Sequence, residues 1–532
     1  MFSSKKNDTT PAPPNPWTNL AILSCVSVMI MYAETMLLPA IPDIIKDFNA
    51  SYNTASWILS GYLITAAIVT PMIGKLSDIY GRKKILILVL IIFAASILSG
   101  GFTSDLSFLV GTRVLQGVGL SVFTTSLSII RTEFPQQRYG IAQTIVSSSH
   151  AAGSAMGVGI GGFVIHYFGW HFTFISLMPV VIALLLIVML FLRLRDDEKN
   201  KQNRKERQKE GKKEKAKKMP ILDIKGAIAL TATIAAFLIA LSYLDTDSNL
   251  RSGADSSSSV DNDNTIIGNL IDTSWTIPII LVPIILVLVG AVSLMLFIKV
   301  ERRAISPLIN LKLIANKIIL SVNLMFIVLE ASKLMIYLTI PILIRAPSPV
   351  GFDGNAIEAG IIQNTFMLTF LAFAPIVGFM IDKFGSIKPL LIGSMASLIG
   401  YFGILAFHSS ELSIIANLAA ISIGATLISS AGWNILLRAT PVQFTGVSVG
   451  MTLVLDFIGM SIGPVIAGMY LQSNTELFLK DNAASSLFPS AEAYNLVFLT
   501  AALASIIFIV FAILLKKVMP LNLTQPPANS FP

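Results

Sequence analysis

The chain has 532 residues, of which 54% are hydrophobic and 13% charged, and its mean hydropathy is +0.75. One or two soluble cores cannot hold so many apolar side chains, so the composition excludes a soluble globular protein and indicates one that lies in a lipid bilayer. The net charge of +8 requires no nucleic-acid partner, because the basic residues gather between apolar runs, as the positive-inside rule expects. A single cysteine, Cys25, excludes an intramolecular disulfide and a cysteine metal site.

Apolar runs of about 20 residues, the length that crosses ~30 Å of hydrocarbon, predict fourteen membrane-spanning helices. In chain order they are expected at 18–41, 53–74, 84–103, 106–131, 139–165, 170–193, 225–245, 275–299, 317–345, 357–381, 386–408, 411–438, 445–470 and 493–516. An even number of spans places both termini on one side, and the Lys/Arg-rich connections place that side in the cytoplasm.

The connections predict the domain organisation. A polar, proline-rich cytoplasmic tail without a cleaved signal peptide (1–17) precedes a six-helix bundle (18–194). The Lys/Arg/Glu-rich linker that follows (195–224) is interpreted as a solvated segment that fixes topology, rather than as a nucleic-acid or lipid-headgroup site. Two inserted helices (225–299) with an acidic external loop (246–274), a cytoplasmic loop (300–316), a second six-helix bundle (317–516) and a cytoplasmic tail (517–532) complete the prediction.

The short basic loop at 74–84 carries the most specific motif. It reads GKLSDIYGRKK and resembles the G-x-L-[SA]-D-x-x-G-R-[KR]-[KR] loop of major facilitator superfamily transporters, with every defining position filled by Gly74, Asp78, Gly81, Arg82, Lys83 and Lys84. The resemblance implies a gating loop in which Asp78 latches the cytoplasmic helix ends in the outward-open state. The structural alternative is that Asp78 only caps a helix.

An internal repeat supports two related halves. Gly378, Asp382 and Gly385 reproduce Gly74, Asp78 and Gly81, each 304 positions later, although Ser386 and Ile387 replace the arginine and the first lysine. The resemblance therefore implies an all-α integral membrane protein with the major facilitator fold: two six-helix bundles plus two inserted helices, with substrate bound between the bundles near mid-depth.

Further runs resemble drug-efflux members of the family. Arg113 opens an R-x-x-Q-G-x-G run, and because an unpaired charge in a span is costly it is expected to face the bundle interior with a partner, in a functional or a purely structural pair. An antiporter-type motif, with valine in place of its usual proline, is matched by Gly153, Gly157, Gly161 and Gly162, for which a small-residue packing face is the simpler explanation. A related run lies at 459–468. An acidic residue before Leu-Pro-x-Ile, here Glu34, resembles the fourteen-helix drug:proton antiporters.

Ionisable residues inside predicted spans are functional candidates because lipid makes them costly. Burial favours the protonated form of a carboxyl, which can then carry a proton across. The proton-coupling candidates are Glu34, Asp456, Glu330 and Arg113; Glu330 and Lys333, three residues apart on one helix, alternatively neutralise each other. Candidate substrate-binding residues, each of which has helix packing as its simpler role, are Tyr62, Phe123, Asn323, Gln363, Asn364, Phe366, Trp433 and Asn434.

The sequence favours a secondary transporter over an enzyme. It lacks a phosphate-binding GxxxxGK[ST], an HExxH and a GxSxG, and its four histidines have no metal-ligand spacing, so neither a cofactor nor a metal is expected. The preferred interpretation is a monomeric plasma-membrane exporter of cationic or amphipathic drugs that exchanges them for protons by alternating access. The alternatives are a facilitator of one metabolite, by symport or uniport, and a receptor on the same scaffold that does not transport.

Overall fold

The computed structural model describes residues 15–134, 136–194, 224–243, 281–303, 313, 315–441, 444–478 and 486–519. The expected acidic loop and nearly all of the expected tails and basic linker lie outside these residues, as does much of the 300–316 loop. In the described part, thirteen helices are long and apolar enough to cross a membrane, and a shorter apolar stretch, Ile228–Phe237, lies within the helix α10. Helices therefore occupy all fourteen ranges expected from the apolar runs.

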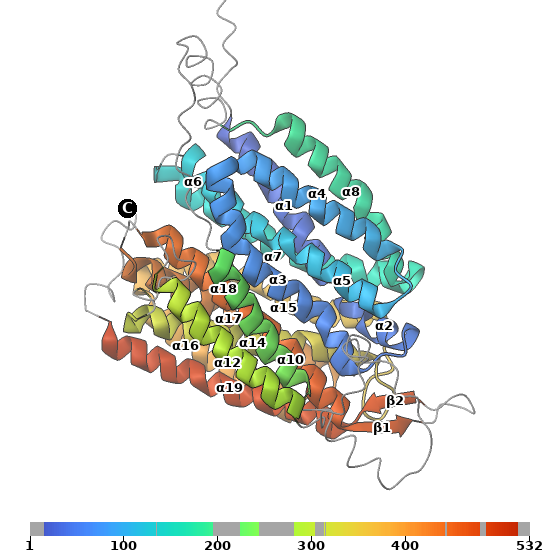
Figure 1. Cartoon of the computed structure of the whole chain (residues 1–532). Helices are drawn as coiled ribbons and strands as arrows, with labels where there is room; N and C mark the ends of the chain where they lie inside the picture. Colours follow the sequence, from blue (N-terminus) through green and yellow to red (C-terminus); the bar gives the residue numbers. More distant parts are fainter. Residues whose placement is uncertain are drawn as a thin grey trace, which may run out of the picture.

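The first part of the chain forms one bundle, blue to cyan in Figure 1. Its elements are α1 (Pro16–Thr35), η1 (Leu38–Ala40), α2 (Ile41–Asp47), α3 (Tyr52–Tyr80), α4 (Arg82–Gly101), α5 (Leu106–Gln116), η2 (Gly117–Ser121), α6 (Val122–Glu133), α7 (Gln136–Phe168) and α8 (Trp170–Phe191). Within this bundle α1 packs on α7, α4 on α8, and α3 on α5 and η2.

The last part forms a second bundle, and two helices lie between the parts in sequence. These two, α10 (Ile224–Tyr243) and α12 (Leu281–Glu301), pack on each other, and α10 also contacts α3 and α18. The second bundle contains α14 (Lys317–Arg345), α15 (Ala356–Phe384), α16 (Ile387–Ala406), α17 (Glu411–Ala439), α18 (Thr445–Ser473), β1 (Thr475–Phe478), β2 (Ser486–Pro489) and α19 (Ala491–Val518). Its pairings, α14 with α18, α16 with α19 and α15 with α17, repeat those of the first bundle.

Two expected elements differ in detail from the structure, and one observed element was not expected. The first expected span ends earlier, at Thr35, and η1 and α2 follow it, because Pro39 and Pro42 cannot continue a regular helix. The fourth span is not continuous: α5 and α6 are joined by the tighter turn η2, where a Cβ on Gly117 would collide with the backbone of Tyr62. The antiparallel hairpin of β1 and β2 has no counterpart among the sequence predictions.

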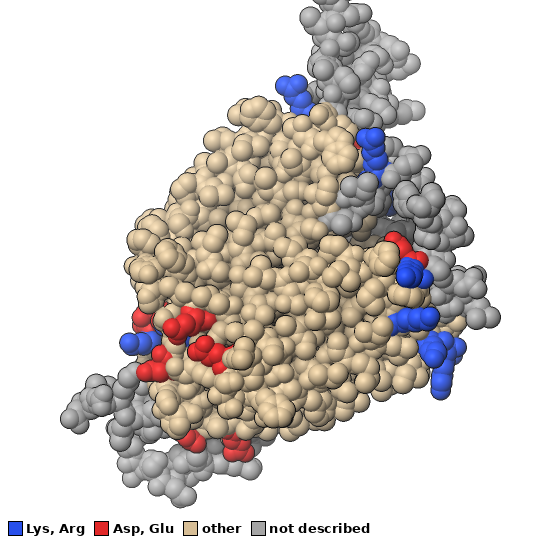
Figure 2. Space-filling view, turned by 180° about the vertical axis from the view of Figure 1, so that it is seen from behind, with Lys and Arg blue, Asp and Glu red and all other residues tan. Residues whose placement is uncertain are grey.

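The lipid-facing surface is apolar and the two ends carry opposite charge. Side chains such as Leu288 and Met295 of α12 are 59% and 70% exposed, which suits contact with hydrocarbon. Figure 2 shows a broad uncharged band between an end where most of the visible Lys and Arg gather and an end rich in Asp and Glu.

Two glycines close equivalent turns at the basic end. Gly81, between α3 and α4, has φ 101°, and Gly385, between α15 and α16, has φ 74°; residues with a side chain rarely adopt these values. The basic end is called the glycine-turn end below. The opposite end, where α3 and α15 begin and the β1–β2 hairpin lies, is called the hairpin end (Figure 1).

Candidate functional site

The two bundles meet along two equivalent seams, α3 against α18 and α7 against α15. A Cβ on Gly162 of α7 would lie 2.7 Å from the Ala356 carbonyl oxygen at the start of α15. In the other seam, a Cβ on Gly468 of α18 would lie 3.0 Å from the Tyr52 carbonyl oxygen at the start of α3. The bounds of α15 are those of α3 shifted by 304, so the two glycines make equivalent contacts between the halves.

Polar contacts close the hairpin end further. Ser60 Oγ donates to the Ser461 carbonyl at 2.9 Å, and the Tyr52 backbone N–H donates to Gln472 Oε1 at 2.9 Å. These bonds join α3 to α18 across the boundary between the bundles. The halves are therefore in close backbone contact at this end.

The other glycines of the motif serve packing within one half. A Cβ on Gly153, Gly157 or Gly161 would collide with backbone of α1 or of Met36, which follows it, whereas Gly162 faces α15. The predicted packing face is thus present, and the motif also supplies a contact between the halves. In the related run, Gly459 and Gly463 pack in the same way against α14.

A hollow opens between the halves toward the glycine-turn end. It has a volume of about 370 Å³ and is lined by Val28 of α1, Leu371 of α15 and the α7 residues Ile145, Ser148, Ser149 and Ala152. The helices α7 and α15 touch at Gly162 but leave this space further along. The conformation is therefore closed at the hairpin end and hollowed toward the glycine-turn end.

Arg113 is fully buried and holds three elements together. Its Nη1 donates to the Ala33 carbonyl at 2.9 Å and to Gln116 Oε1 at 2.8 Å, and its Nη2 donates to the Glu34 carbonyl at 3.0 Å. Its Nε donates to the Ile58 carbonyl at 3.3 Å, and its guanidinium lies 4.6 Å from the centre of the Tyr62 ring. These bonds join it to the backbone of Glu34 and not to the carboxyl group, so Arg113 fixes the end of α1 that carries this acid.

Four ionisable side chains from both halves act on one another at the centre. The charges of Lys333, Arg113 and Glu330 act on the Glu34 carboxyl, and those of Glu330 and Lys333 act on Asp456. Glu330 and Lys333 form an ion pair on α14. Buried oxygens of Glu34 (Oε2) and Asp456 (Oδ1) find no hydrogen-bond partner among the described residues. We call Glu34, Glu330, Lys333 and Asp456 the central cluster.

Some of the predicted substrate-binding residues lie beside this cluster. Tyr62 packs against Arg113, and Gln363 donates to the Tyr337 carbonyl at 2.9 Å. Phe366 makes an edge-to-face contact with the Tyr337 ring, with centroids 5.2 Å apart. Tyr337 itself, which feels the charges of Glu330 and Glu34, was not predicted, because a lone tyrosine in an apolar run carries no sequence signal.

The other predicted substrate-binding residues lie in different surroundings. Phe123 packs edge-on against His150 of α7, Trp433 lies 5.7 Å from Phe326 by ring centroid, and Asn434 accepts a bond from Ser386 at 2.9 Å. Asn323 donates to the Ile319 carbonyl of its own helix, and Asn364 faces Gly159 across the seam between α15 and α7. None of these contacts involves a residue of the central cluster.

Among the predicted gating-loop residues, the structure describes the side chains of Arg82, Lys83 and Lys84. Lys83 Nζ donates to the carbonyls of Met189 and Leu192 at the end of α8, at 2.9 and 2.6 Å, and Arg82 donates to Thr132 of α6 at 2.8 Å. The side chain of Asp78 lies outside the described residues. In the second copy, Asp382 is exposed and a Cβ on Gly378 would meet nothing within 4 Å.

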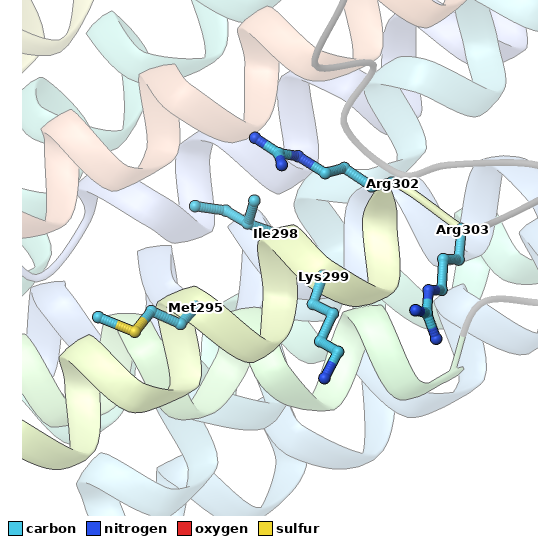
Figure 3. Close-up of a pocket in the computed structure, with 5 residues that line it drawn as sticks. All are labelled: Met295, Ile298, Lys299, Arg302 and Arg303. Atoms are coloured by element: carbon cyan, nitrogen blue, oxygen red, sulfur yellow. The ribbon is translucent and has the colours of Figure 1, made fainter.

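A second hollow, of about 380 Å³, lies at the end of α12. Figure 3 shows its lining residues Met295, Ile298, Lys299, Arg302 and Arg303. All five come from one helix and its end, and none belongs to the central cluster. The described residues contain no group of three or more His, Cys, Asp or Glu side chains that could hold a metal ion.

Two helical bundles that enclose ionisable residues within a bilayer define a membrane transporter of small molecules rather than an enzyme. A family model described as Major Facilitator Superfamily matches residues 23–292 and 324–531, and the chain belongs to this superfamily. The protein is therefore a multi-pass membrane transporter.

Several relatives are named for drug export or resistance. The chain is 33% identical over 183 residues to the multidrug efflux pump LfrA of Mycolicibacterium smegmatis, a match that covers 34% of this chain and 36% of the relative. It is 30% identical over 171 residues to the tetracenomycin C resistance and export protein of Streptomyces glaucescens, with 32% of each chain covered. The methyl viologen resistance protein SmvA of Salmonella typhimurium is 23% identical over 86% of this chain and 82% of its own. The matches to the first two relatives span only about a third of their length.

Solved structures share the fold. The nucleoside transporter NupG has a TM-score of 0.58 at 11% identity, with 94% of this chain and 99% of that chain covered. The human organic anion transporter MFSD10 has a TM-score of 0.55 at 12% identity, with 94% and 100% covered.

Proposed function

We propose that the protein exports cationic or amphipathic drugs in exchange for protons, by alternating access. The observation that supports the proposal is a pair of buried carboxyl oxygens on Glu34 and Asp456, one in each half, for which the described part of the chain offers no hydrogen-bond partner. A carboxyl group without a fixed partner can bind either a proton or a cationic substrate, and exchange of the two on one group couples their movements. The names of the relatives described above, which refer to efflux, export and resistance, support the outward direction.

The hollow of this conformation faces the cytoplasm in the proposed topology. Cytoplasmic connections carry an excess of Lys and Arg, and the glycine-turn end is the basic end of the molecule (Figure 2). The hairpin end is then external, and the termini are cytoplasmic. Substrate enters the hollow from the cytoplasm and reaches the central cluster, and opening of the hairpin end releases it outside. The two six-helix bundles, with the α10–α12 pair as an insertion, are the moving parts of this scheme.

Purified protein in proteoliposomes tests the proposal. An imposed pH gradient is expected to drive accumulation of a fluorescent cationic drug and a matching movement of protons. Glu34→Gln and Asp456→Asn are each expected to abolish the proton movement while the protein still folds and inserts. Glu411→Gln, which changes an exposed acid at the start of α17, is the matched control and is expected to transport normally.

Three outcomes would overturn the proposal. If both carboxyl variants transport at the native rate under a pH gradient, neither acid couples transport to protons. If the protein moves one metabolite and none of a panel of dyes and drugs, it is a facilitator of that metabolite. Ligand binding without any flux would identify a receptor.

A further inference from the structure

The repeat places Glu34 and Lys333 at equivalent positions of the two halves. In the first half, Gly153 and Gly157 of α7 pack on the carbonyls of Val28 and Tyr32 in α1. In the second half, Gly459 and Gly463 of α18 pack in the same order on the carbonyls of Ile327 and Ala331 in α14. Two residues after Tyr32 comes Glu34, and two residues after Ala331 comes Lys333.

An axis along the membrane normal relates parallel repeats, so equivalent positions of the two halves lie at the same depth in the membrane. Lys333 lies close enough to Glu34 for its charge to act on the carboxyl group, in agreement with this placement. The second half thus presents a cation where the first presents an acid. Lys333 is also ion-paired with Glu330 and acts on Asp456, so three carboxyl groups share one ammonium group.

The charges at the centre nearly balance. Arg113 adds a second cation, but its guanidinium is committed to three backbone carbonyls and to Gln116. With all five groups ionised, three negative charges face two positive ones. One negative charge is left without compensation, and one added positive charge neutralises the site.

We infer that Lys333 is a specificity-determining residue: it is a built-in cation that limits the central cluster to substrates with one positive charge. The inference rests on the proposed function and adds the charge class of the substrate. Removing the ammonium group leaves two uncompensated negative charges, which suits a dication. Because Coulomb energies between neighbouring charges in a partly buried site are large, we expect a change in selectivity of about tenfold or more.

Two dyes with the same aromatic core test the inference: ethidium, which carries one positive charge, and propidium, which carries two. Initial export rates are measured in proteoliposomes of the full chain, and binding of each dye to detergent-solubilised protein is measured by its fluorescence increase. The wild type is expected to favour ethidium. Lys333→Gln is expected to raise the propidium-to-ethidium ratio about tenfold in both measurements.

Two further variants separate charge from structure. Lys333→Arg keeps the charge and is expected to keep the wild-type ratio. The double variant Glu330→Gln/Lys333→Gln removes one charge of each sign and is expected to return the ratio toward that of the wild type. A purely structural role of Lys333 predicts that Lys333→Gln lowers export and binding of both dyes by the same factor.

An unchanged ratio in Lys333→Gln, in both export and binding, would overturn the inference. The proposed function fails separately: a wild type that binds the dyes but exports neither is not a drug exporter, and the binding ratio alone then decides the role of Lys333. If the wild type binds neither dye, both the proposed substrate class and the inference are wrong.

Discussion

Arg345 and Asp43 join the two halves of the protein at the hairpin end. Both Nη groups of Arg345, at the end of α14, donate to the carboxylate of Asp43 in α2. Nη1 also donates to the Pro39 carbonyl at 3.1 Å. Bidentate Arg–carboxylate pairs are geometrically specific. A Cβ on Gly360, which packs against Gly162, would lie 3.8 Å from Pro39, so this pair is close to the seam between α7 and α15. It forms only while the hairpin end is closed, so it stabilises the conformation that is hollowed toward the glycine-turn end.

Asp43→Asn is therefore expected to open the hairpin end more often. Loss of a partly exposed ion pair is worth about 1 kcal/mol, which is roughly a fivefold shift in the balance of conformations. A cysteine introduced at Ser149, in the hollow, is expected to react correspondingly more slowly with a polar thiol reagent, in a Cys25→Ser background.

The matched control is Asp47→Asn in the same short helix. Asp47 accepts a bond from Trp170 Nε1 at 2.8 Å, a contact within one half, so this variant is expected to leave the reactivity at position 149 unchanged. Exchange of the two charges, Asp43→Arg with Arg345→Asp, is expected to restore the closed hairpin end. Equal reactivity in Asp43→Asn and the wild type would show that the ion pair does not hold this end closed.

The helices of this fold could be predicted from sequence because lipid imposes their length. An apolar run of about 20 residues has few alternatives to a spanning helix, and all fourteen runs became helices. The related glycines were also informative, since Gly81 and Gly385 both adopt positive φ at equivalent turns. Local packing was less predictable: the break between α5 and α6 depends on a close approach of Gly117 to Tyr62, 55 positions earlier in the chain.

The site was only partly predictable for a similar reason. Ionisable residues in apolar runs are conspicuous, and Glu34, Glu330 and Asp456 do gather with Lys333. Their mutual arrangement depends on which helices cross, and helices that are apolar on nearly every face do not reveal this. The pairing of Arg345 with Asp43 joins residues 302 positions apart, and each of them alone resembles an ordinary charge at a helix end.

Gly162→Ala is expected to act on the same conformational balance as Asp43→Asn. The added methyl group would lie 2.7 Å from the Ala356 carbonyl oxygen, so the halves must separate at the hairpin end or accept a strain of roughly 1–3 kcal/mol. Slower reaction of the cysteine at position 149 would report the separation.

Two glycine variants serve as controls for this prediction. Gly153→Ala places its methyl group against Val28 within one half, and it is expected to lower thermal stability more than it changes reactivity. Gly111→Ala meets nothing within 4 Å and is expected to change neither. If Gly153→Ala and Gly162→Ala change the reactivity equally, the seam between α7 and α15 has no special role in closing the hairpin end.

The last prediction concerns Arg113, whose guanidinium binds backbone from α1 and α3 at once. Lysine keeps the charge but offers one compact ammonium group, which cannot reach the carbonyls of Ala33, Glu34 and Ile58 together. Each hydrogen bond from the charged guanidinium that is lost costs about 1.5–3 kcal/mol, so Arg113→Lys is expected to lower the melting temperature clearly and to slow transport. Ser99→Ala, which removes an exposed bond within α4, is the control and is expected to change neither. A role of Arg113 as a proton carrier predicts the opposite pattern, in which Arg113→Lys keeps the melting temperature but loses the proton movement that accompanies transport. Measuring both quantities in this one variant separates a residue that positions Glu34 from one that carries the proton itself.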